Sequence, residues 1–104
     1  MSATLSKHGI EIPMEQLAEL CQRYHVRELA LFGSVLRDDF RVDSDIDVLV
    51  EFESDAPIGL LEYIGLQNEL TDLLGRDVDL VEKTGLKRLI RDSVINSARL
   101  LYAA

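Results

Sequence analysis

The stretch LFGSVLRDDFRVDSDIDVLVEF, residues 31–52, decides how this chain is interpreted. An apolar run ends in Gly33-Ser34, ten residues follow, and Asp45 and Asp47 stand at the head of a second apolar run. Because side chains of a strand alternate between its faces, the two aspartates are expected on one face, with Cα atoms about 7 Å apart. Two such carboxylates can hold the divalent ions of a two-metal site. The Gly-Ser turn offers backbone N–H groups and a hydroxyl to a phosphate, so the stretch indicates nucleotide chemistry.

A third carboxylate comes from a later strand-like segment, DVDLV at residues 77–81. If this segment pairs beside residues 45–52, Asp79 can approach the first two aspartates. We prefer Asp79 to Asp77 because Asp79 lies mid-strand between apolar residues, whereas Asp77 follows a turn, where solvation explains it. Three partly buried carboxylates repel one another, and bound divalent cations relieve that repulsion. The sequence therefore predicts a metal site formed by two neighbouring strands.

Composition limits the class of protein. The chain has 104 residues, of which 47% are hydrophobic, so we expect residues 1–104 to form a single globular domain. The N-terminus lacks the apolar stretch of a signal peptide, and no apolar run reaches the ~18 residues of a membrane span. A single cysteine excludes an internal disulfide framework and favours a cytoplasmic location. The net charge of −8 argues against direct nucleic-acid binding, although many soluble domains are acidic.

Helical and strand-like segments alternate along the chain, which predicts an α/β fold: a small β-sheet with helices packed on it. The expected helices span residues 13–25, 58–74 and 86–96, and the expected strands span residues 27–32, 45–52 and 77–81. Residues 34–40 form a short helix or loop, and residues 99–102 form either a last strand or a continuation of the preceding helix. Gly75 is expected to cap the helix before it.

Several residues have both a structural and a functional interpretation. Gly33 could serve only as a turn glycine, and Ser34 could be a plain helix N-cap. Asp45 and Asp47 could form a solvated edge, but Leu49 shares their predicted face, which is therefore not simply exposed. Cys21 falls on the apolar face of its helix and is expected to pack in the core.

Two arginines in the loop before the second strand are weaker candidates. Arg37 and Arg41 could bind triphosphate oxygens, because a guanidinium matches phosphate geometry. The alternative is that both are surface residues paired with nearby aspartates, and the sequence does not decide between these readings. Neither histidine has a metal-ligand partner at a recognisable spacing, so a zinc site is not expected.

The Gly-Ser turn, the ten-residue gap, the Asp-x-Asp pair and the later LLGRDVDLV segment at residues 73–81 resemble the nucleotidyltransferases of the DNA polymerase beta superfamily. More narrowly, the chain is similar to the minimal nucleotidyltransferases, which are about this length. The resemblance implies a mixed sheet with the nucleotidyltransferase fold. It also implies that Gly33 and Ser34 contact the triphosphate of ATP.

The same resemblance implies the remaining roles. Asp45 and Asp47 would coordinate two Mg²⁺ ions, and Asp79 would bind the catalytic metal and help to deprotonate the attacking hydroxyl. Members of this group often act as antitoxins of HEPN-domain ribonuclease toxins in HEPN/MNT systems, and active members transfer AMP from ATP to a tyrosine of the toxin. We expect the same activity and partner here.

Size narrows the choice of acceptor. A domain this small has little surface left for a second substrate, so we expect the acceptor to come with another protein or a second copy, as a homo- or hetero-oligomer. A small-molecule acceptor of the aminoglycoside kind is disfavoured for the same reason. The alternative function is a non-catalytic antitoxin that masks its partner with an acidic surface.

Overall fold

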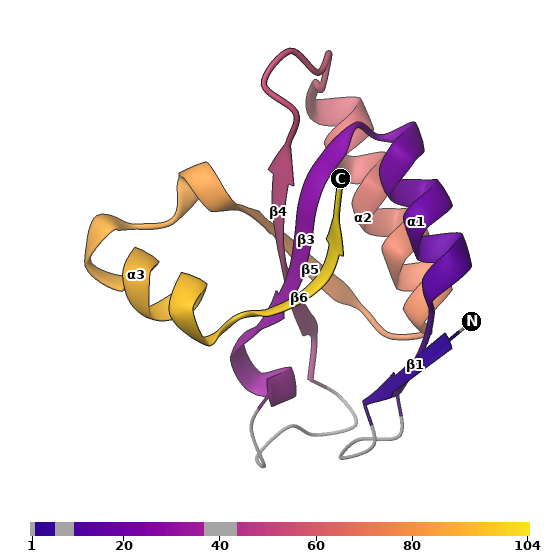
Figure 1. The fold of residues 1–104 in the computed structure, drawn as a ribbon, viewed down its shortest axis with the longest axis horizontal. Coiled ribbons are helices and arrows are strands. Elements are labelled where there is room, and N and C mark those ends of the chain that lie inside the picture. The colour runs from indigo at the N-terminus through magenta and orange to yellow at the C-terminus, as the bar shows by residue number, and fades with distance from the viewer. Residues whose placement is uncertain (1, 6–9, 37–43) are drawn as a thin grey trace.

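The centre of the molecule is a four-stranded mixed sheet with the strand order β5-β4-β3-β6 (Figure 1). The computed structural model describes residues 2–5, 10–36 and 44–104. The strands are β3 (Val26–Phe32), β4 (Ile46–Phe52), β5 (Val78–Glu82) and β6 (Arg99–Ala103). β4 and β5 are parallel, whereas β3 pairs antiparallel with both β4 and β6. This arrangement confirms the expected mixed sheet with helices packed on it.

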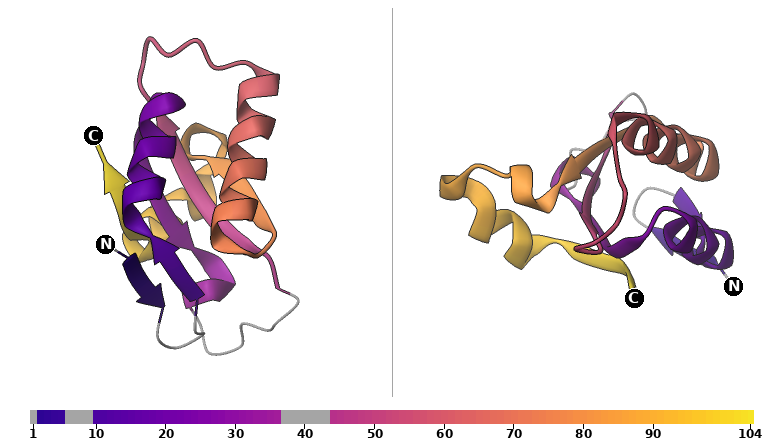
Figure 2. Two further views of the ribbon diagram at one scale, coloured as in Figure 1. Left: turned by 90° about the vertical axis from the view of Figure 1, so that its right-hand side faces the viewer. Right: turned by 90° about the horizontal axis from the view of Figure 1, so that it is seen from above.

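The helices lie on opposite sides of this sheet. α1 (Met14–Arg23) and α2 (Leu60–Leu74) lie together on one side, and α3 (Arg88–Ser97) lies on the other, as the right-hand view of Figure 2 shows. Two 3₁₀ turns, η1 (Gly33–Leu36) and η2 (Lys83–Gly85), follow β3 and β5. Among the described residues, none of the helices is both long and apolar enough to cross a membrane.

The side of the sheet under α1 and α2, which we call the covered face, holds the core. Strand alternation points Ile46, Val48 and Val50 to this face, and all three are 0% exposed. Leu66 and Leu70 of α2 pack against them and are also fully buried. Their spacing of four residues puts them on one helix face, so the apolar stripe of α2 explains its position.

The opposite side, which we call the open face, carries the residues between those core positions. They include Phe32, Asp47 and Asp79 at one level, followed by Ala30 and Leu49. Only the small apolar part of this face is buried, with Ala30 at 8% and Leu49 at 5% exposure. The two faces therefore differ in chemistry: the covered face holds the apolar core, and the open face mixes carboxylates with a few apolar side chains.

The N-terminal segment forms a hairpin that the sequence analysis did not predict. β1 (Ser2–Leu5) pairs antiparallel with β2 (Ile10–Pro13), and β2 packs against α2. The signal was present in β2, where Ile10 and Ile12 are buried and Glu11 between them is exposed. Four residues are too short a run for alternation to stand out. Pro13 ends this strand, and α1 begins at the next residue.

Most other boundaries agree with the prediction to within two residues. Gly75 caps α2 in the left-handed conformation, with φ of 70°, as expected. The last segment is a strand, β6, and not a continuation of α3. α1 ends two residues earlier than predicted because the chain reverses at His25, whose φ is 57°.

Candidate active site

The carboxylates that the sequence singled out meet on the open face. In the parallel pair of β4 and β5, Asp47 lies directly opposite Asp79. Neighbouring strands are about 4.8 Å apart, so the two side chains emerge next to each other. Asp47 is half-buried and Asp79 is exposed. The structure thus brings together the two aspartates that the sequence analysis expected from neighbouring strands.

The start of the two strands sets this register. The Ile46 N–H donates to the Asp77 carbonyl at 2.8 Å, so β4 and β5 begin side by side. Asp77 comes directly before β5 and is exposed. The residue that pairs with Asp47 is Asp79, two residues after Asp77. The preference for Asp79 over Asp77 therefore agrees with the observed register.

Gly33, directly after β3, borders the site on the side of that strand. It follows β3 with φ of 73°, a conformation that glycine adopts without strain. A Cβ atom added to Gly33 would overlap Oδ2 of Asp47 and lie 3.1 Å from its Cγ. The backbone turn is therefore in direct contact with the Asp47 carboxylate, and a side chain at this position would displace that carboxylate. This close approach goes beyond the turn role that any glycine could perform.

Asp45 does not complete a three-carboxylate cluster. β4 begins at Ile46, so Asp45 precedes the strand and is exposed. In the described part of the chain, no three His, Cys, Asp or Glu side chains lie close enough together to hold a metal ion. Strand alternation constrains a side chain only within the paired strand, so the predicted role of Asp45 as a metal ligand stays a prediction.

The pair of Asp47 and Asp79 nevertheless fits magnesium. Mg²⁺ prefers oxygen ligands and is usually held by one or two carboxylates, with substrate phosphates and water completing the octahedron. Two carboxylates on adjacent strands beside a backbone turn supply the protein share of such a set. The chemistry of the donors is therefore compatible with a magnesium site that forms together with a nucleotide.

Three polar side chains of α2 hold β5 in place, and the sequence analysis missed them. Tyr63 donates its hydroxyl to the Leu80 carbonyl, Gln67 Oε1 accepts from the Leu80 N–H at 3.0 Å, and Thr71 Oγ1 accepts from the Val78 N–H at 3.2 Å. We call these three residues the α2 ladder.

The α2 ladder binds the free edge of β5, since β5 is the last strand of the sheet. Its hydrogen bonds fall on both sides of Asp79 in the sequence, so they fix the backbone that carries this carboxylate. Burial raises the pKa of the Tyr63 phenol, which keeps the hydroxyl protonated as a donor. The spacing of four residues between ladder positions was the available signal, because it places polar groups in a row along one helix face.

Arg76 is a second residue whose role the sequence analysis did not assign. It lies in the quoted LLGRDVDLV segment, is half-buried, and donates to the Ser44 carbonyl at 2.9 Å. This bond ties the connection between α2 and β5 to the backbone just before Asp45. Arg37, Arg41 and the Ser34 side chain lie outside the described residues, so their predicted roles stay predictions.

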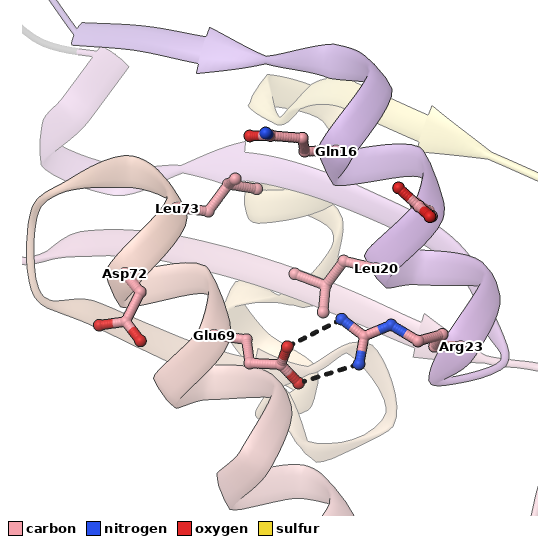
Figure 3. Close-up of a pocket in the computed structure, with 7 residues that line it drawn as sticks. Gln16, Leu20, Arg23, Glu69, Asp72 and Leu73 are labelled. Atoms are coloured by element: carbon pink, nitrogen blue, oxygen red, sulfur yellow. Dashed lines mark hydrogen bonds and ion pairs between the residues drawn. The ribbon is translucent and has the colours of Figure 1, made fainter.

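A hollow lies between α1 and α2 (Figure 3). It measures about 440 Å³, and Arg23 crosses it to pair with Glu69 at 2.8 Å. Glu69 also accepts a hydrogen bond from Tyr24, and the bonds from Arg23 and then Tyr24 lower the pKa of Glu69. These contacts join the two helices and explain the residues of this hollow as structural.

Cys21 is likewise structural. It is 0% exposed on the inner face of α1, and burial raises its pKa to about 12. A thiol with that pKa is protonated at neutral pH and is a poor nucleophile. The prediction that Cys21 packs in the core is confirmed.

Comparison with known proteins agrees with this geometry. Residues 13–101 match the sequence family described as nucleotidyltransferase domain. Protein adenylyltransferase MntA of Thermococcus cleftensis is 47% identical over 77 residues, which are 74% of this chain and 76% of that protein. A solved structure described as a minimal nucleotidyltransferase has a TM-score of 0.69 at 39% identity, covering 82% of this chain and 85% of that one.

A further match shows the fold alone. It is a chain in the complex of a tri-AMPylated HEPN toxin with an MNT antitoxin from Shewanella oneidensis, with a TM-score of 0.61 at 22% identity. The alignment covers 88% of this chain and 70% of that one. The resemblance drawn from the Gly-Ser turn and the aspartates is thus confirmed: the chain belongs to the nucleotidyltransferase domain family, among its minimal members.

Proposed function

We propose that this nucleotidyltransferase transfers AMP from ATP to a hydroxyl group of a partner protein. The observation that carries the proposal is the register pair of Asp47 and Asp79, which lies against the Gly33 turn on the open face. In this family such a pair has the donor atoms for magnesium, and the turn has backbone N–H groups for a triphosphate.

Asp47 and Asp79 are the proposed ligands of Mg²⁺, and Asp45, directly before β4, is the proposed third ligand for a second ion. Bound Mg²⁺ would neutralise the triphosphate and stabilise charge at the α-phosphate. Gly33 and Ser34 hold the triphosphate through their backbone N–H groups, and Arg37 and Arg41 contact its oxygens.

Asp79 accepts the proton of the attacking hydroxyl. The acceptor oxygen forms a bond to the α-phosphorus while the bond from that phosphorus to the bridging oxygen breaks, so that pyrophosphate leaves. The products are an AMP–protein ester and pyrophosphate. In-line attack of this kind depends mainly on positioning and charge stabilisation, which two aspartates and a rigid turn provide.

The proposed acceptor is a tyrosine of a HEPN-domain toxin, for which the chain acts as the antitoxin. Two findings support this choice. The relative from Thermococcus cleftensis is named a protein adenylyltransferase, and the chain of similar fold from Shewanella oneidensis belongs to a complex with an AMPylated HEPN toxin.

The test is transfer of labelled AMP from ATP to the product of the neighbouring gene or, where that is not a HEPN-domain protein, to a HEPN-domain toxin, with Mg²⁺ present. We expect Asp47→Asn to lower the rate at least about 100-fold, because charge stabilisation at the α-phosphate is lost. Asp72→Asn, an exposed aspartate of α2, is the matched control and should transfer at the wild-type rate. EDTA should abolish transfer. A wild-type rate in Asp47→Asn would contradict the proposed site.

The second candidate function is neutralisation by masking, which the net charge of −8 favours because an acidic surface can cover a basic partner. AMP transfer requires the carboxylates of Asp47 and Asp79, whereas masking does not. If the double variant Asp47→Asn/Asp79→Asn still neutralises the toxin in cells at normal expression, masking explains the activity. If neutralisation is lost while the complex still forms, AMP transfer explains the antitoxin activity.

A further inference from the structure

α3 differs from the other helices in having no buried residue. α1 and α2 each bury three side chains, whereas Leu89 of α3 is 98% exposed and Ile90 is 48% exposed. A leucine with nearly its whole side chain in water contributes nothing to the fold of the isolated chain. The N-terminal half of α3 is therefore an apolar surface without a partner within the described molecule.

The C-terminal end of α3 anchors the helix to the open face. Ile95 and Ala98 line a cavity of about 190 Å³ together with Ala30, Leu49 and Leu100. Lys83, in η2, borders the same cavity and forms ion pairs with Glu51 at 3.4 Å and Glu28 at 3.6 Å. The ion pairs of Lys83 join η2, which precedes α3, to β3 and β4. α3 lies on the side of the sheet opposite α1 and α2 (Figure 2).

This position puts α3 on the same side of the sheet as the candidate active site. Its C-terminal end borders Leu49, which follows Asp47 by two residues on the same face of β4, about 7 Å along the strand. A protein that docks on α3 would therefore lie on the side of the sheet that carries Asp47 and Asp79.

Charge identifies the kind of partner. Residues 83–99 contain five basic residues and one acidic residue, a net charge of +4, although the whole chain carries −8. The other 87 residues therefore carry −12, and the basic residues are concentrated on one segment. Lys87, Arg88 and Arg91 are all exposed. Such a segment attracts an acidic surface on a partner and helps to orient it.

The exposed leucine and isoleucine favour a protein over a nucleic acid. Contacts with nucleic-acid backbone come mainly from basic and polar side chains, which leaves Leu89 and Ile90 without a role. Protein interfaces, in contrast, combine an apolar centre with a charged rim that sets orientation. α3 has this composition, with Leu89 and Ile90 between Arg88 and Arg91.

We propose that the exposed half of α3, residues 87–91, is the docking surface for the acceptor protein, which presents acidic side chains around an apolar contact. This inference rests on the proposed function, because it takes the acceptor of AMP to be a protein. It adds the place where that protein binds and the chemistry of its binding patch.

Matched pairs of exposed residues test the proposal. Leu89→Ser is compared with Leu61→Ser, since Leu61 is an 81% exposed leucine of α2. Arg88→Glu is compared with Arg27→Glu, since Arg27 is an exposed arginine of β3 outside the basic segment. All four side chains are exposed, so the variants should fold, and circular dichroism confirms it.

Two measurements are made with the acceptor protein identified in the AMP-transfer test. Calorimetry without ATP gives the Kd of the complex, and labelled ATP gives kcat and KM for AMP transfer. We expect Leu89→Ser and Arg88→Glu to raise both the Kd and the KM for the acceptor about tenfold or more. The kcat and the Kd for ATP should stay unchanged, and the two control variants should behave as wild type.

Several outcomes would overturn the docking surface. Wild-type affinity in Leu89→Ser and Arg88→Glu would do so, as would equal losses in the control variants. A loss of ATP affinity in Arg88→Glu would assign the arginine to the nucleotide, and tight binding of a 20-nucleotide RNA in place of the protein would assign α3 to nucleic acid. Failure of the proposed function is distinct: the wild-type complex forms, and α3 variants weaken it, but no AMP is transferred.

Discussion

The covered and open faces of one sheet divide stability from chemistry. On the covered face, Ile46, Val48 and Val50 are fully buried under α1 and α2. On the open face, Asp47 lies between core residues of β4 and Asp79 between core residues of β5, and both remain in reach of solvent. Alternation along β4 thus lets consecutive residues serve the core and the site in turn. The comparison teaches that substitutions one residue apart should act on different properties.

The largest effect is expected on the covered side, at Leu66 of α2. Leu66→Ala should lower the free energy of unfolding by about 3 kcal/mol, because the residue is fully buried and leaves a cavity. Leu61→Ala on the same helix, where the side chain is 81% exposed, should change it by less than about 0.5 kcal/mol. Urea denaturation measures both. Equal losses would show that the apolar stripe of α2 does not form the core.

On the open face, substitution of Gly33 should lower the rate of AMP transfer. Gly33→Ala adds a Cβ that overlaps the Asp47 carboxylate, and we expect AMP transfer to fall about 100-fold because the carboxylate is displaced. Gly75→Ala is the matched control: its φ is 70°, but no atom lies within 4 Å of the added Cβ. Both variants should lose about 1 kcal/mol of stability from the left-handed backbone.

Comparing these two glycine variants separates the effect of the contact with Asp47 from the effect of the left-handed backbone conformation, which both positions share. Transfer assays and thermal denaturation on both separate the two contributions. If Gly75→Ala lost as much activity as Gly33→Ala, the contact with Asp47 would not matter to the reaction.

A smaller loss of stability and activity is expected at the α2 ladder, where side chains of α2 bind the strand that carries Asp79. Gln67→Ala leaves the Leu80 N–H without its acceptor and should cost about 1 kcal/mol of stability. Hydrogen exchange at the Leu80 amide should accelerate, and transfer should slow because β5 carries Asp79. Asn68→Ala, an exposed neighbour on α2, is the control. Unchanged protection of Leu80 in Gln67→Ala would disprove the ladder.

The smallest effect concerns the pair of Arg23 and Glu69 in the hollow of Figure 3. The pKa of Glu69 is lowered in the folded chain, so its contribution is present above the ordinary glutamate value of about 4.3 and is lost as pH falls through the folded value. The Tm difference between wild type and Glu69→Gln should be largest at neutral pH and shrink as the pH falls below the ordinary glutamate value. A difference that stays constant with pH would rule out this linkage.

Local sequence was enough to predict much of this molecule. Apolar periodicity identified α2 and the central strands, and Gly75 marked the end of α2 as observed. The prediction was weaker where a segment was short, as at the β1–β2 hairpin. It was also weaker at Asp45, since the paired strand starts only at the next residue. Short strands and the ends of strands depend on hydrogen-bond partners in other segments, which the local sequence does not reveal.

The sequence by itself determined the components of the site: the Gly-Ser turn, the aspartates of two strands and the family that they indicate. Only the tertiary structure decided which aspartate faces which, because the parallel pairing of β4 with β5 sets the register of Asp47 and Asp79. It also decided that Gly33 must lack a side chain and that α2 holds the edge of β5. Alternation and spacing are properties of a segment, whereas register and close contact are properties of two segments brought together.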